Sequence, residues 1–103
     1  MIVFRYYDRA GRPMSQMEWA VAFERPENAI VEQTTLPNGR WVSTVWLGLD
    51  HGHGDGPPLI FETLVFRNSG GHSELDCASE EEAHAGHARM VEKWTRKKSE
   101  RTN

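Results

Sequence analysis

Cysteine is almost absent from this sequence: Cys77 is the single thiol among 103 residues. One thiol cannot form a disulfide within the chain, and it cannot supply a zinc site built from several cysteines. We expect Cys77 to be a small, buried hydrophobic residue. Because such sparing use of cysteine is typical of a reducing compartment, we predict a cytoplasmic protein.

Long apolar runs are also missing. No stretch approaches the roughly 18 apolar residues of a membrane-spanning helix. The apolar start of the chain is interrupted at Arg5, which is too early for a signal peptide. The basic excess of a general nucleic-acid binder is absent too, since the net charge is −3. The sequence therefore argues against a membrane and against nucleic acid as partners.

What the chain does contain is enough for one folded domain. It holds four Trp and four Phe, which bury large areas per residue. A chain of this length can build one core without disulfides or metals. We predict a single domain over residues 1–98 and a frayed tail over residues 99–103.

Strand patterns dominate the chain before residue 78. Segments with the composition of strands are 2–7, 17–25, 29–36, 40–49, 59–67 and a short edge strand at 73–77. In 17–25, large apolar residues at every second position favour a half-buried strand over a helix. Asn38-Gly39 predicts a two-residue type I′ turn, which makes 29–36 and 40–49 antiparallel neighbours. Gly48 indicates a bulge or a close approach of another group to the backbone.

A single helix is indicated near the C-terminus. Ser79 and Glu82 have the spacing of a capping box, and acidic residues at the start with basic residues at the end match the helix dipole. The apolar stripe for packing on a sheet is Ala83, His87, Met90, Val91 and Trp94. Together the patterns predict an α+β fold, an antiparallel meander of about five strands with one C-terminal helix packed on a face.

The loop between strands 40–49 and 59–67 carries the clearest hint of chemistry. It holds His51, His53 and Asp55, which are ligand types found in zinc, nickel and iron sites. His87 or Glu62 would complete a metal site if the loop folds over the helix. The alternative is a solvated loop, rich in Gly and Pro, whose histidines bind nothing.

Two charged features remain open to two interpretations each. Glu62, inside an apolar run, could act as a general acid or base beside a histidine. The alternative is an ion pair with Arg5, Arg40 or Lys93, or an outward position at the sheet edge. The segment 89–101 holds six basic and two acidic residues, a net +4 that leaves −7 for the rest of the chain. This basic end either binds an acidic partner or nucleic acid, or compensates the helix dipole.

Aromatic side chains are too numerous for the one side of a sheet that a single helix covers. Trp19, Trp41, Trp46 and Phe66 are therefore predicted to contribute to an exposed patch. Such patches bind a protein partner or a second copy of the chain, so we predict protein binding and a homodimer. The alternative is that long loops cover the second face of the sheet.

A recognisable pattern runs through about the last two thirds of the chain. It consists of VSTVWLGLDH at 42–51, GPPLIFETLVF at 56–66, EEA at 81–83 and GH at 86–87, with MV at 90–91. The pattern resembles a small family of phage- and prophage-encoded proteins, short and mostly uncharacterised. The resemblance implies a protein of the host cytoplasm that binds a host or phage protein, in the way that some small phage proteins block CRISPR nucleases. It transfers no catalytic residue.

Two functions from different classes follow. The first is a protein-interaction module that acts without a cofactor. The second is a metal-dependent enzyme centred on His51, His53 and Asp55, with His87 or Glu62. An enzyme requires polar groups that converge in a concave pocket, whereas a binding module presents an apolar or charged surface.

Overall fold

The computed structural model describes residues 5–50 and 56–97. In chain order the elements are β1 (Tyr6–Tyr7), β2 (Pro13–Met14), α1 (Gln16–Phe23), α2 (Pro26–Ala29), β3 (Ile30–Thr35), β4 (Trp41–Trp46), β5 (Phe61–Arg67), β6 (Gly70–Cys77) and α3 (Glu80–Arg96). The loop residues His51, His53 and Asp55 and the expected tail at 99–103 lie outside the described residues.

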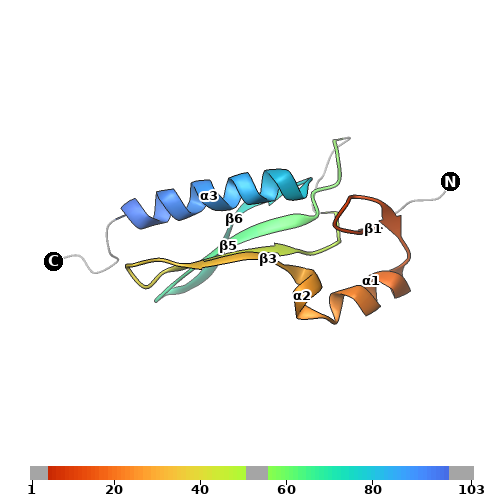
Figure 1. Ribbon diagram of the computed structural model, residues 1–103, viewed down its shortest axis with the longest axis horizontal. Coiled ribbons are helices and arrows are strands. Elements are labelled where there is room, and N and C mark those ends of the chain that lie inside the picture. The colour runs from red at the N-terminus through yellow and green to blue at the C-terminus, as the bar shows by residue number, and fades with distance from the viewer. Residues whose placement is uncertain (1–4, 51–55, 98–103) are drawn as a thin grey trace.

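The centre of the fold is a four-stranded antiparallel sheet in the order β3-β4-β5-β6, so the strands form a meander. Helix α3 runs along one face of this sheet and contacts all four strands (Figure 1). The α+β class, the antiparallel sheet and the packed C-terminal helix are therefore confirmed. The strand count differs from the expected single sheet, because β1 and β2 pair with each other as a separate two-stranded sheet.

Helix α3 begins and packs as predicted. The Ser79 hydroxyl accepts from the Glu82 amide, and the Glu82 side chain accepts from the Ser79 amide, so the capping box is complete. Of the predicted stripe, Ala83, His87 and Trp94 are buried. At the other end, the buried Arg40 guanidinium donates to the carbonyl oxygens of Trp94 and Lys97, each at 3.0 Å. Side chains thus form hydrogen bonds, at both ends of the helix, with backbone groups that have no partner within the helix.

The core lies between α3 and the sheet in two clusters. One contains Leu36, Val42, Val65 and Trp94 and lies under the C-terminal half of α3. The other contains Trp46, Ile60, Phe61 and Ala83, and residues from β1, β2 and α1 pack around it. Alternate residues of β4 and β5 point into this layer, as strand geometry requires. The N-terminal elements therefore close one end of the core.

The prediction of a strand at 17–25 is wrong, because these residues form α1. In the helix, Trp19 and Phe23 share one side and stack on each other with ring centroids 5.0 Å apart. Met17 and Val21 share the other side and are exposed. Since the helix has large apolar residues on both sides, its sequence shows no period of 3.6 residues. Ser15 and Glu18 form a capping box, a local signal that indicates the helix start.

The hairpin between β3 and β4 is confirmed, but the predicted type I′ turn is wrong. The amide of Gly39 donates to the Leu36 carbonyl at 2.9 Å, and among residues other than glycine none of those described has a positive φ. Pro37 therefore occupies the first central position of a type I turn, which its fixed negative φ favours. Gly39 then takes the left-handed conformation, with φ of 86°. Proline before Asn38 thus changes the turn that Asn-Gly alone would favour.

Two strand boundaries also differ from expectation. Of the strand predicted at 2–7, the described part contains the short β1, which is joined to the end of β4 by a bridge between Tyr6 and Leu49 and by the side chain of Trp46. The edge strand predicted at 73–77 is confirmed and begins earlier, at Gly70. The turn that joins it to β5 is correspondingly tight, because Arg67 and Gly70 are direct partners in the ladder.

Candidate functional site

The face of the sheet that points away from α3 is the candidate site, and we call it the open face. The strand registers place on it Ile30, Gln33 and Thr35 of β3, Trp41, Ser43 and Val45 of β4, Glu62, Leu64 and Phe66 of β5, and Gly71, Ser73 and Asp76 of β6. Its apolar members are half-buried or, in the case of Ile30, exposed. No helix in the described part of the chain spans this face as α3 spans the other.

Aromatic side chains form a row across one end of the open face. Trp41 and Phe66 are direct partners on β4 and β5, and their rings stack with centroids 4.8 Å apart and planes at 30°. Phe66 in turn lies over Gly71 of β6, where a Cβ would stand 2.5 Å from two ring carbons. The absence of a side chain at Gly71 therefore gives the ring its place, and the two rings form one continuous apolar surface.

Acidic side chains occupy the opposite end of the open face. Glu62 and Asp76 are direct partners on β5 and β6. Within the described residues neither carboxylate has a hydrogen bond or an ion pair, and Asp76 is exposed. Like charges directly opposite each other on a sheet are destabilising. A cationic group from a partner would remove this repulsion.

The expected ion pairs of Glu62 are not formed in this structure. Arg40 donates to the end of α3 on the other side of the sheet. Lys93 pairs with Glu74 at 3.0 Å. Glu62 faces the open side, beside Val45 and Asp76. Glu62 therefore points outward, as weighed from the sequence, but the expected position at the sheet edge is wrong, because β5 lies between β4 and β6.

The two other tryptophans of the predicted patch lie elsewhere. Trp46 is 1% exposed, belongs to the core and donates from Nε1 to the Tyr7 carbonyl at 3.0 Å. Trp19 is half-buried on α1 and donates from Nε1 to the Leu47 carbonyl at 2.8 Å. The structure therefore brings Trp41 and Phe66 together and separates Trp19 and Trp46 from them.

His87, a candidate metal ligand, lies in a buried network of hydroxyl groups. Its ring is 1% exposed. Nε2 hydrogen-bonds with the Thr34 hydroxyl at 2.8 Å, and Nδ1 with the Thr44 hydroxyl at 2.7 Å. Thr44 also hydrogen-bonds with Thr63 at 2.8 Å. Both ring nitrogens are thus satisfied, and a metal ion would have to displace one of these bonds.

A chain of charged groups leads from this network to the surface. Glu32 lies 2.8 Å from Nδ1 of His84, and Glu80 lies 3.5 Å from Nε2 of the same ring. Arg9 completes the chain with two hydrogen bonds of 2.9 Å to Glu80. The hydrogen bond to Glu32 raises the pKa of His84, whereas burial lowers the pKa of His87. The pKa values of the two histidines of one helix are therefore shifted in opposite directions.

No metal site emerges from the residues that the structure covers: no three or more His, Cys, Asp or Glu side chains are arranged to hold an ion. A site made by the loop itself, from His51, His53 and Asp55, stays a prediction.

Basic residues gather around Trp94 at the far end of α3. Arg40, Arg67, Lys93 and Lys97 each place a cationic group 5.0–5.5 Å from the centre of the indole ring. Glu74 accepts from the indole Nε1 and from Lys93. This cluster compensates the helix dipole and packs on the aromatic ring, so it has a structural role. It lies on the α3 side of the sheet, away from the open face.

Among residues 5–50 and 56–97, no helix combines the length and the apolar character needed to span a membrane.

The comparisons with known proteins give no similarity from which a function could be transferred. Comparison with protein-family models, with curated proteins and with solved structures gives no match. The resemblance to phage-encoded proteins therefore stays a prediction, and the function has to be argued from the geometry of the surface.

Proposed function

We propose that this protein is an interaction module that binds another protein through the open face of its sheet. The observation that carries the proposal is the stacked pair of Trp41 and Phe66 on a sheet face that no helix of residues 5–50 and 56–97 spans. Aromatic residues held in place by their neighbours are the usual anchors of protein interfaces. The pair loses little conformational freedom on binding, because packing already fixes both rings.

The charges on this face specify the partner's chemistry. Glu62 and Asp76 lie beyond the apolar row and have no cationic partner among the described residues, so the matching surface carries large apolar side chains bordered by Lys or Arg. A nucleic acid fits this face poorly, because its phosphates would meet the two carboxylates. The basic cluster around Trp94 lies on the α3 side and would not offset that repulsion.

The partner we propose is a host or phage protein, in line with the resemblance to phage-encoded proteins. Proteins that handle nucleic acids, such as CRISPR nucleases, expose basic channels that an acidic chain can occupy. The charge of −7 outside the segment 89–101 supports this choice. Inhibition of such a nuclease is the most specific form of the proposal, and a homodimer would present two open faces at once.

The test compares two double variants of the tagged protein in quantitative capture from bacterial lysate. Trp41→Ser with Phe66→Ser removes the aromatic row. Met17→Ser with Val21→Ser removes a similar apolar area from α1 and serves as the matched control. We expect a stoichiometric protein that is recovered with the wild type and with the control, and lost with the first variant.

A charge reversal makes the test specific to the acidic end. Glu62→Lys with Asp76→Lys should reduce the recovery of the same protein at least tenfold if that protein supplies the cations. Circular dichroism should show that every variant is folded. Recovery of no stoichiometric protein, or equal recovery with all variants, would overturn the proposal.

A further inference from the structure

We infer that two copies of this chain pair through helix α1, antiparallel and around a twofold axis, on a surface separate from the open face. The inference does not depend on the function proposed above. It rests on the exposure of one side of α1, on a groove beside that side, and on charges that complement their own copies.

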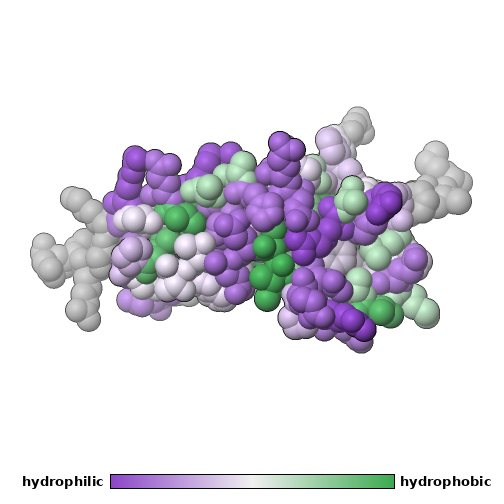
Figure 2. Space-filling model, viewed as in Figure 1, coloured by the Kyte–Doolittle hydropathy of each residue, from purple (hydrophilic) through white to green (hydrophobic). Residues whose placement is uncertain are grey.

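The exposed large apolar residues of the described chain are concentrated in one segment. Met17 is 77% exposed, Val21 is 60% exposed, and Phe23 and Ile30 are 37% and 40% exposed. Met17 and Val21 lie on the side of α1 that faces away from the core, whereas Phe23 stacks with Trp19 on the packed side and Ile30 belongs to the open face. Hydrophobic surface appears over α1 in Figure 2. A surface helix normally has one apolar side and one polar side. Helix α1 is apolar on two sides, while the part of the chain that the structure describes packs against one of them.

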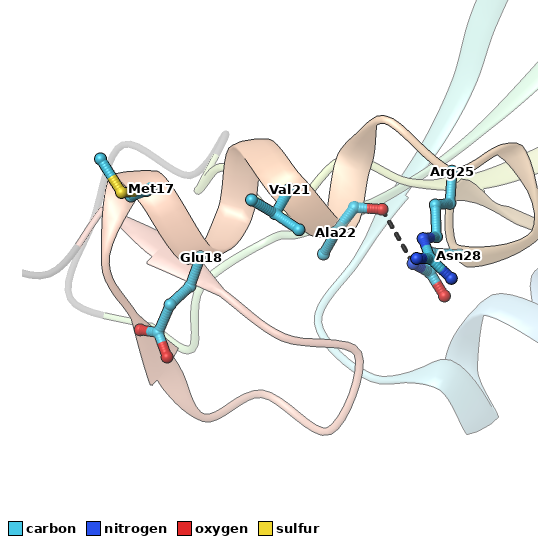
Figure 3. Close-up of a pocket in the computed structure, with 6 residues that line it drawn as sticks. All are labelled: Met17, Glu18, Val21, Ala22, Arg25 and Asn28. Carbon is cyan, nitrogen blue, oxygen red and sulfur yellow. Dashed lines mark hydrogen bonds between the residues drawn. The ribbon is translucent and has the colours of Figure 1, made fainter.

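A groove follows the exposed side of the helix. It has a volume of about 460 Å³ and is lined by Met17, Glu18, Val21, Ala22, Arg25 and Asn28 (Figure 3). Asn28 of α2 donates from its side chain to the Ala22 carbonyl at 2.9 Å, which holds α2 against the end of α1. The groove is therefore a fixed feature of the α1–α2 corner.

The charges that border this groove indicate a second copy as the occupant. Glu18, in the first turn of α1, and Arg25, the residue that precedes α2, both line the groove and are exposed, and neither forms an ion pair with the other or with another described residue. A twofold axis near Val21 and Ala22 places Glu18 of each copy beside Arg25 of the other. Two reciprocal ion pairs then border an apolar centre. A foreign partner would have to reproduce this pattern, whereas a second copy carries it already.

The side chains at the proposed axis allow a close approach. Within α1, Glu18, Val21 and Ala22 follow the spacing i, i+3, i+4 of a helix-packing stripe, and Arg25 lies just beyond the helix end, before α2. Ala22, at the centre, is small and lets two helix axes come within about 8 Å. In the antiparallel arrangement, Met17 of each copy points toward the groove near Arg25 and Asn28 of the other. The contact involves one short helix and its neighbour, so we expect a weak dimer at the low end of interface sizes.

The experiment is sedimentation velocity of the full chain from about 1 μM to 1 mM, with two single charge reversals and their mixture. In Arg25→Glu, residue 18 of each copy faces residue 25 of the other across the axis, and both are acidic. In Glu18→Lys, the same two positions are both basic. We expect each variant alone to dissociate at least tenfold more readily than the wild type. Mixed together, they should form a heterodimer, because both reciprocal pairs are then attractive. Since Glu18 also caps α1, heterodimer formation shows in addition that its variant is folded.

Controls distinguish this surface from the others. Glu24→Lys changes the charge of α1 outside the groove and should leave association unchanged. Trp41→Ser with Phe66→Ser should also leave it unchanged, so failure of the open-face proposal would not affect this one. A monomer at every concentration would overturn the inference. A dimer that tolerates Arg25→Glu and Val21→Glu would overturn it equally, because it would have to form elsewhere.

Discussion

The ring of Phe66 lies over Gly71 of the neighbouring strand, in the space that a side chain at Gly71 would fill. Trp41 stacks on the other side of Phe66, so one glycine at the sheet edge sets the positions of two aromatic residues on the open face. Glycine in a strand often marks such a close approach. The proposed anchor pair therefore depends on an edge residue that has no side chain of its own.

Alanine at Gly71 is the direct test of this relationship. The added Cβ would stand 2.5 Å from two carbons of Phe66, so the ring must move and the stack with Trp41 must change. We expect a loss of about 1–3 kcal/mol in the free energy of unfolding, as for other overpacked sites. Urea denaturation measures the loss, and near-ultraviolet circular dichroism reports the aromatic stack. Gly56→Ala, with open space around the new Cβ, is the control and should change little.

Gly48 and Gly39 separate the effect of backbone conformation from the effect of crowding. Both have positive φ, 72° and 86°. A Cβ at Gly39 meets nothing, whereas a Cβ at Gly48 would lie 2.5–2.8 Å from atoms of Trp19 and Trp46. We expect Gly39→Ala to cost about 1–2 kcal/mol in unfolding free energy from strain alone. Gly48→Ala should cost about 1–3 kcal/mol more, since the two indoles must also shift. Equal losses of unfolding free energy for the two variants in urea denaturation would show that the two indole rings move aside without a measurable cost in free energy.

Local signals account for the parts of the fold that the sequence predicts well. The capping box at Ser79 and the stripe from Ala83 to Trp94 lie within one helix, so no distant contact is needed to recognise them. The same holds for the hairpin around Asn38-Gly39, and for Gly48, where a close approach was expected and two indoles are found. These predictions succeed because propensity, spacing and packing agree.

Helix α1 was missed because its alternation is misleading. Large residues at 17, 19, 21 and 23 fit a strand, and in the helix they divide between a packed side and an exposed side. The capping box of Ser15 and Glu18 was the contrary signal. In a strand, all four residues would lie on one face. The strand prediction therefore does not reveal the exposed side of α1, on which the dimer is proposed.

The candidate site was predictable only in part. That an aromatic patch contributes to binding follows from composition, but which aromatic residues share a face depends on register. Trp41 meets Phe66 because β4 and β5 pair across a long loop, and Trp46 on the same strand points to α3 instead. The partners of His87 come from two strands, Thr34 of β3 and Thr44 of β4. Such contacts depend on tertiary pairing that no local pattern in the sequence encodes.

Arg40 is predicted to stabilise the end of α3 through its hydrogen bonds more than through its charge. Arg40 is 5% exposed, and its guanidinium donates to the carbonyl groups of Trp94 and Lys97 at the helix end, the first of which also accepts from the Asn38 side chain. Arg40→Met keeps much of the packing volume and removes the donors, so we expect a loss of about 1.5–3 kcal/mol in unfolding free energy.

The matched control for Arg40 is Arg96→Ala. Arg96 is exposed and, among the described residues, pairs with Glu92 one turn away on the same helix. Exposed pairs of this kind contribute little, so urea denaturation should show a change within about 0.5 kcal/mol. Similar losses for both variants would mean that Arg40 acts as a surface charge like any other.

His87 should make the fold sensitive to acid. Burial lowers the pKa of its ring below the usual 6.5, so as the pH falls below 6.5 the unfolded chain takes up a proton that the folded chain does not. Stability is therefore lost toward acid. The effect of His84 on stability has the opposite direction. Because its pKa is raised in the folded state, His84 contributes stability at pH values below 6.5, and this contribution is lost as the pH rises through the pKa of the folded state. Because the two effects oppose each other, they have to be separated by substitution.

His87→Gln removes the buried titrating ring and keeps a side chain that can donate and accept hydrogen bonds. We expect it to lower the unfolding free energy at pH 7.5 by about 1–3 kcal/mol, because the hydroxyls of Thr34 and Thr44 lose ideal partners. We also expect a smaller further loss between pH 7.5 and 5 than the wild type shows, as measured by urea denaturation at each pH. His84→Gln should make the loss of unfolding free energy between pH 7.5 and 5 larger than in the wild type, since it removes the histidine whose protonation stabilises the fold. An unchanged slope in His87→Gln would mean that the buried imidazole gains its proton in the folded state as easily as in the unfolded one, which its two short bonds to threonine hydroxyls and its burial argue against.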